Sequence, residues 1–117
     1  ARRVLEDRAE ARPEQYRIQR ALARTYAGLA LHERAITAIE RAREGLPLEV
    51  DRWAAPELIE DHAYVLARAG RAAEAAELLR FLLENPSRNR VSVPLLRLSP
   101  RWDAIRDHPA FRALLEG

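Results

Sequence analysis

The sequence predicts an all-α fold, because its apolar residues recur at three- and four-residue steps over stretches of roughly 12 residues. Gly and Pro, which end helices, stand singly between these stretches. The pattern also repeats, since Pro13 and Pro47 are 34 residues apart and Leu5 and Ile39 keep the same spacing. Repetition at about 20–50 residues is typical of stacked structural units. We therefore expect helix hairpins stacked along the chain.

The first three helices are expected on either side of two prolines. Residues 1–11 form the first helix, with Val4 and Leu5 on its apolar side. Pro13 ends it and allows the next helix to run over residues 14–27. The third helix covers residues 33–44 and is closed by Gly45 and Pro47. The apolar side of the second helix is expected to comprise Ile18, Leu22, Tyr26 and Leu29.

A second pair of helices follows a short connector. Pro56 suits the first turn of a helix, and Gly70 provides the turn after it. A further helix over residues 72–83 ends at Asn85-Pro86-Ser87. The residues expected to be buried are Leu58, Ile59, Ala63, Leu66 and Ala69 in one helix and Ala75, Ala76, Leu79 and Leu82 in the other.

The last part of the chain does not repeat. Ser92 and Ser99 each precede an apolar stretch with a proline, so both are expected to cap helices. We expect a short helix at 94–98 and further helical turns at 100–106 and 109–116. A stacked array must cover its last apolar face. The residues expected to do so are Trp102, Ile105, Phe111, Leu114 and Leu115.

Residues 19–47 carry the skeleton of a known repeat. Leu22-Ala23, Tyr26, Ala35, Ile39 and Pro47 stand at the offsets of the tetratricopeptide repeat (TPR), with Gln19 in the place of its Trp. The chain thus resembles the TPR family over residues 1–86. This resemblance implies antiparallel hairpins stacked as a short right-handed solenoid with a C-terminal helical cap. It divides the chain into 1–90 (half repeat 1–13, repeats 14–47 and 56–86) and a cap over 91–117.

Composition and charge narrow the class of protein. At 48% hydrophobic and 32% charged the chain has the composition of an ordinary globular domain, and it contains no cysteine. No run approaches the roughly 18 apolar residues of a membrane span. All 20 basic residues are Arg, but 18 acidic residues leave a net charge of only +2. We therefore expect a protein that binds neither membrane nor nucleic acid. Composition leaves the compartment undecided, and the resemblance to the TPR family implies a cytoplasmic protein.

The sequence gives no basis for a catalytic, cofactor or metal site. Each serine lies near a proline and is interpreted as a cap or turn residue. The four glycines stand singly, so no Gly-rich phosphate loop is present. His32, His62 and His108 lack the spacing of metal ligands. His62 is interpreted as a partly buried packing residue and His108 as a residue at the border of the last helix. We expect a non-enzymatic protein.

The resemblance implies that the first helix of each hairpin lines a concave surface. On that surface Arg17, Arg20 and Arg24 project together from the first full repeat. One interpretation is that these arginines bind an acidic peptide or a C-terminal carboxylate. The other is that Arg20 and Arg24 pair with neighbouring acids and are solvated. In the next repeat the same surface presents Glu57, Glu60, Tyr64 and Arg68.

The expected function is a non-catalytic protein–protein interaction module. The segment over residues 96–115 resembles the end of TPR regions at the C-termini of large bacterial regulatory proteins, such as serine/threonine kinases, cyclase-like proteins and winged-helix regulators. Two alternatives stay open: a self-assembly module, and the regulatory part of an enzyme whose catalytic domain lies upstream. Because the first helix of the leading hairpin is missing, we expect residues 1–11 to be covered by preceding chain or by a second copy.

Overall fold

A computed structural model describes residues 16–45, 55–85 and 91–116, and all the regular structure within these ranges is helical. The all-α class is therefore confirmed. The expected helix over residues 1–11 lies outside the described residues. Each helix that can be compared begins and ends within two residues of its expected bounds. The elements are α2 (Tyr16–Gly28), α3 (His32–Gly45), α4 (Ala55–Arg68), α5 (Ala72–Glu84), α6 (Val93–Leu98), the 3-10 helix η2 (Pro100–Ile105) and α7 (Pro109–Glu116).

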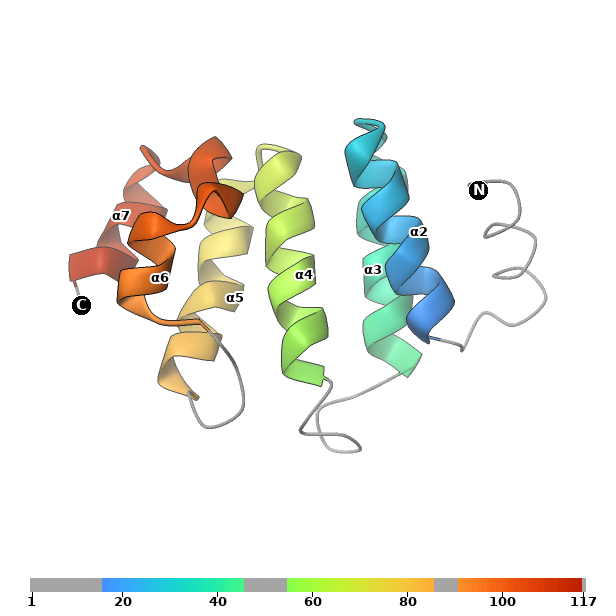
Figure 1. Ribbon diagram of the computed structural model, residues 1–117, viewed down its shortest axis with the longest axis horizontal. Helices are drawn as coiled ribbons and strands as arrows, with labels where there is room; N and C mark the ends of the chain where they lie inside the picture. Colours follow the sequence, from blue (N-terminus) through green and yellow to red (C-terminus); the bar gives the residue numbers. More distant parts are fainter. Residues whose placement is uncertain (1–15, 46–54, 86–90, 117) are drawn as a thin grey trace.

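The helices stand side by side in two rows (Figure 1). In that view α2 and α4 lie in front, with α3 and α5 behind them. The helix α2 packs mainly on α3 and α4 packs on α5, while α3 joins the two hairpins by packing on α4. At the C-terminal end α7 packs on α5, and η2 packs on α4. Consequently α4 is the central helix, with α2 on one flank and η2 on the other.

The turns of the two hairpins have the same backbone geometry. The amide of Leu31 donates to the carbonyl of Tyr26 at 2.9 Å, and the amide of Arg71 donates to the carbonyl of Leu66 at the same distance. Each turn contains one residue with positive φ, which is Ala30 at 60° in the first and Gly70 at 80° in the second. Because equivalent residues are 40 positions apart, the two turns are copies of one local structure.

The buried core follows the predicted apolar pattern with one clear exception. In α4 and α5 all the residues that were expected to be buried are buried, except Ala69, which is half-buried. In α2, Leu22 and Tyr26 are buried and Ile18 is half-buried. The prediction for Leu29 is wrong, because its side chain is 55% exposed. Leu29 lies just past the end of α2, where the chain turns away and the helical stripe no longer applies.

The C-terminal segment is capped as the sequence predicts. The Ser92 side chain accepts a hydrogen bond from the amide of Leu95, and the Ser99 side chain accepts one from the amide of Arg101, both at 3.3 Å. The Nδ1 atom of His108 accepts from the amide of Ala110 at 3.1 Å, which places it at the border of α7. Four of the five covering residues are buried, and Leu115 is half-buried. They share one core cluster with the hairpins, so this segment is part of the same fold.

Within the three described ranges, no helix has the length and the apolar character needed to cross a membrane.

Candidate partner-binding groove

The predicted site residues lie on α2 and α4, and the structure brings most of them together. Arg20 of α2 reaches across to Glu57 of α4, with 3.5 Å between Nη1 and Oε2. Tyr64 receives a hydrogen bond from Arg68, four residues further along α4, at 3.4 Å. Arg17, in contrast, is exposed and, among the described residues, donates to the hydroxyl of its neighbour Tyr16 at 3.1 Å. That phenol raises the pKa of the Arg17 guanidinium above its ordinary value.

The centre of the arrangement is Asp61, whose role sequence reasoning missed. It is only 4% exposed. Its Oδ2 atom accepts from Nε of Arg20 in a very short contact and from Nη2 of Arg24 at 3.4 Å. A buried carboxylate requires such partners, because removing its charge from water is costly. A signal for Asp61 was present, since it stands four residues after Glu57 and three before Tyr64 and therefore shares their helix face.

A third arginine reaches Asp61 from the C-terminal segment. Arg101 of η2 donates from Nη2 to Oδ1 of Asp61 at 2.7 Å and from Nη1 to Oε2 of Glu60 at 3.0 Å. Its guanidinium also lies 4.6 Å from the ring centroid of Tyr64, a cation–π distance. Arg101 lies 40 residues from Asp61 in sequence. No local spacing could reveal this contact, because only the tertiary fold brings η2 onto α4.

We call these six charged residues the Asp61 cluster: Arg20, Arg24, Arg101, Glu57, Glu60 and Asp61. Three guanidinium groups balance three carboxylates, so the cluster is neutral as a whole. The second interpretation of the arginine row, in which Arg20 and Arg24 pair with neighbouring acids, therefore describes their contacts within this chain. Exposure differs among the three cations, because the Arg24 side chain is 60% exposed, that of Arg101 is 33% and that of Arg20 is 25%.

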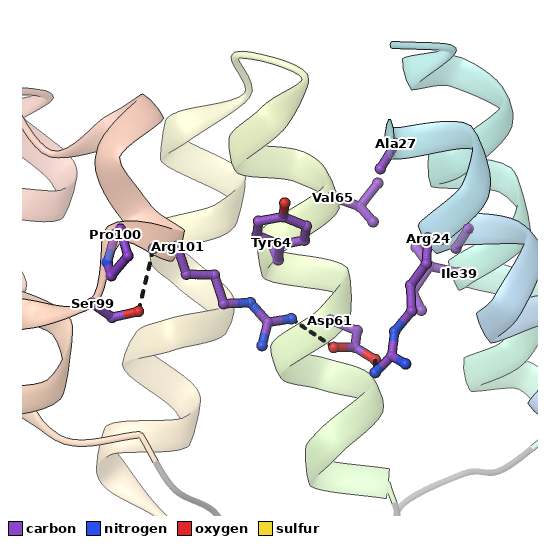
Figure 2. Close-up of a pocket in the computed structure, with 10 residues that line it drawn as sticks. Arg24, Ala27, Ile39, Asp61, Tyr64, Val65, Ser99, Pro100 and Arg101 are labelled. Carbon is purple, nitrogen blue, oxygen red and sulfur yellow. Dashed lines mark hydrogen bonds and ion pairs between the residues drawn. The ribbon is translucent and has the colours of Figure 1, made fainter. Parts of the chain in front are cut away.

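The cluster forms part of a groove of about 630 Å³ across α4. Figure 2 shows Arg24 entering this groove from α2 and Arg101 entering it from the opposite side, with Asp61 between them and Tyr64 above. A volume of this size falls within the range of roughly 300–1,000 Å³ found for ligand pockets. The lining residues are Ala23, Arg24, Ala27, Ile39, Asp61, Tyr64, Val65, Ser99, Pro100 and Arg101.

A second polar contact, outside the groove lining, joins α3 to α4. His62 is buried, and its Nδ1 atom lies 2.9 Å from Nη1 of Arg43. Because a guanidinium can only donate, Nδ1 must be the acceptor and the imidazole is neutral. Burial lowers the pKa of His62 to about 4, with Arg43 and Arg71 adding to the decrease and Glu74 opposing it. Burial also lowers the pKa of Arg43, against the opposite effect of Glu40.

In the part of the chain that the structure describes, no three His, Cys, Asp or Glu side chains gather in a way that could hold a metal ion. Comparison with protein-family models, with curated proteins and with solved structures found no match. The function proposed below therefore rests on the groove and its charged residues.

Proposed function

We propose that this chain is a TPR-like protein–protein interaction module, without catalytic activity, that acts as the C-terminal part of a larger bacterial regulatory protein in the cytoplasm. The equivalent hairpins support this proposal. Ala23 and Ala63, and likewise Ala35 and Ala75, stand at the small-residue positions of the repeat and are completely buried. Small side chains there allow helices to approach closely. The proposed arrangement is a short right-handed stack of such hairpins ending in the cap.

The observation that carries the proposal is Arg24. Its side chain is mostly exposed and lines the groove. Within the described ranges, its guanidinium makes one long contact of 3.4 Å, with a carboxylate that two other arginines already share. Arg24 therefore retains donors for a further anion. Arg17 and Arg68 flank the cluster, and within the described residues both are bonded to tyrosine hydroxyls rather than to carboxylates. In the part of the chain that the structure describes, this face carries five arginines and three carboxylates, which favours an acidic partner segment.

The test is binding of an acidic peptide to the full chain. A fluorescein-labelled decapeptide that alternates Glu and Leu, and its Gln-for-Glu counterpart, serve as probes in an anisotropy titration. We expect the acidic peptide to bind and the Gln peptide not to bind. Arg24→Ala should weaken binding roughly tenfold, as expected for a charge-assisted hydrogen bond. Arg80→Ala is the matched control, because Arg80 is an exposed arginine on α5 outside the groove lining.

Equal losses for Arg24→Ala and Arg80→Ala would contradict the proposal, since only the overall charge would then matter. Salt-dependent binding of random RNA with similar affinity would favour a nucleic-acid-binding solenoid instead.

A further inference from the structure

We infer that Asp61 is an internal competitor that holds the groove arginines in the free protein, and that an acidic partner binds by taking these arginines from Asp61 and Glu60. This inference rests on the proposed acidic partner and adds its regulation. In the free chain the groove is self-neutralised. A partner carboxylate must therefore compete with carboxylates of the protein itself.

The contacts of Asp61 indicate that it can compete with a partner carboxylate for the groove arginines, in addition to stabilising the fold through ion pairs. One carboxylate receives guanidinium groups from three arginines on two different elements, Arg20 and Arg24 from α2 and Arg101 from η2. One guanidinium group is enough to balance the charge of one carboxylate. Two of the three arginines that contact Asp61 therefore exceed what its own charge requires. Among the described residues, the excess is offset by the more exposed Glu57 and Glu60, at 57% and 22% side-chain exposure. Solvent screening weakens those outer pairs.

The accessibility of donors and acceptor is also unequal. The Asp61 side chain is 6% exposed, whereas the arginine side chains around it are 25–60% exposed. An incoming anion therefore meets the guanidinium groups before it meets Asp61, which lies between Arg24 and Arg101 in the groove (Figure 2). Arg24 has the longest contact with Asp61 and should exchange first. Arg101 should follow, because its Nη1 and Nη2 atoms hold two separate carboxylates at 3.0 and 2.7 Å.

Movement of Arg101 should be visible through its aromatic neighbours. Its guanidinium carbon lies 5.7 Å from the ring centroid of Trp102, and that ring lies 6.4 Å from the ring of Tyr64 in an edge-to-face arrangement. A change in the pairing of Arg101 alters the charge next to Trp102. In a Trp53→Phe background Trp102 is the single tryptophan of the chain, so its fluorescence reports on this exchange.

The experiment compares peptide affinities of charge-neutralised variants of the full chain, with the labelled Glu–Leu decapeptide as the probe. Asp61→Asn removes the competitor and should bind the peptide about tenfold more tightly than the parent. Glu60→Gln releases one contact of Arg101 and should bind about threefold more tightly. Glu77→Gln is the matched control, since it removes one negative charge from an exposed position on α5 outside the groove lining. It should change affinity by less than about twofold.

The outcomes separate this inference from the proposed function. If the parent chain binds no acidic peptide but Asp61→Asn does, the competitor is confirmed and the proposed function of the free chain fails. If Asp61→Asn binds no more tightly than the parent, the inference is overturned while the proposed function stands. An equal gain for Glu77→Gln would overturn it as well, because net charge would then explain the effect.

If Asp61→Asn does not fold, Glu60→Gln decides alone, since Glu60 is a more exposed residue whose loss leaves Asp61 with all three arginines. In that variant, the peptide should change Trp102 fluorescence at about threefold lower concentration than in the parent. No shift in that concentration would overturn the inference.

Discussion

The α2–α3 and α4–α5 hairpins have the same turn but opposite charge on their front helices. At equivalent positions α2 carries Arg17 and Arg20 where α4 carries Glu57 and Glu60. The two faces meet, and Arg20 pairs with Glu57 and Asp61 across the boundary. A repeat of identical charge would place like charges side by side. This difference shows that the two hairpins share their turn geometry, whereas the opposite charges on α2 and α4 form the ion pairs that connect one hairpin to the next.

The hairpins also differ in what lies beside them. The structure describes α7 against the outer side of α5, where Phe111 is completely buried in the shared core. Phe111→Ala should therefore produce the largest loss, about 3–5 kcal/mol of the free energy of unfolding, through the cavity it leaves. Urea unfolding followed by circular dichroism measures this. Leu98→Ala, at a residue 79% exposed, is the control and should have little effect. Equal, small effects would show that the C-terminal segment does not support α5.

The charge alternation can be broken at Arg20. Its side chain is half-buried and contacts two carboxylates of the next hairpin, so Arg20→Ala should cost roughly 2 kcal/mol. Arg17→Ala, at the exposed end of the same face, should not change stability measurably. A double-mutant cycle of Arg20→Ala with Asp61→Asn isolates the direct interaction. Additive effects in that cycle would mean that the ion pair does not couple the hairpins.

The hairpins differ in their response to pH, because His62 stands where the first hairpin has Leu22. His62 has a lowered pKa of about 4 when folded and an ordinary value of 6.5 when unfolded. The unfolded chain thus binds the proton first as the pH falls. The contribution of His62 to stability is complete well above pH 6.5 and is lost on going down towards pH 4, at a cost of about 3 kcal/mol.

Replacing His62 by Leu should remove this part of the pH dependence. The measurement is the free energy of unfolding at pH 7 and pH 4.5 in the parent and in His62→Leu. We expect a smaller decrease in the variant. Leu98→Ala, at a non-titrating residue that is 79% exposed, serves as the control and should keep the decrease of the parent. A variant with an unchanged decrease would indicate that carboxylates alone produce the acid sensitivity.

The smallest predicted effects concern the two turns. Ala30 adopts a positive φ, which is energetically unfavourable for any residue that has a Cβ atom. Gly70 has no Cβ atom and adopts the equivalent conformation without this cost. Ala30→Gly should stabilise the protein by about 0.5 kcal/mol, and Gly70→Ala should destabilise it by about 1 kcal/mol. A Cβ atom at Gly70 would meet no atom within 4 Å, so the cost there is conformational. Thermal unfolding measures both changes, and effects of the same sign would contradict the equivalence of the turns.

Local patterns in the sequence were sufficient for the helices and for most of the core. Apolar spacing placed Leu58, Ile59 and Leu79 inside, because a helix presents residues three and four apart on one side. The caps at Ser92 and Ser99 were equally predictable, since capping needs only a side-chain oxygen and amides two or three residues ahead. Each of these features depends on neighbours in the chain, and the sequence displays such neighbours directly.

Only the tertiary structure decided how the predicted site is used. The arginines of α2 were predicted from one helix face, but their acceptor Asp61 lies on another helix, and Arg101 arrives from η2. Charges attract over several ångströms in any direction and carry no sequence period. Which carboxylate meets which guanidinium is therefore set by the packing of α2, α4 and η2, and a sequence pattern can show that the charges exist but not that they meet.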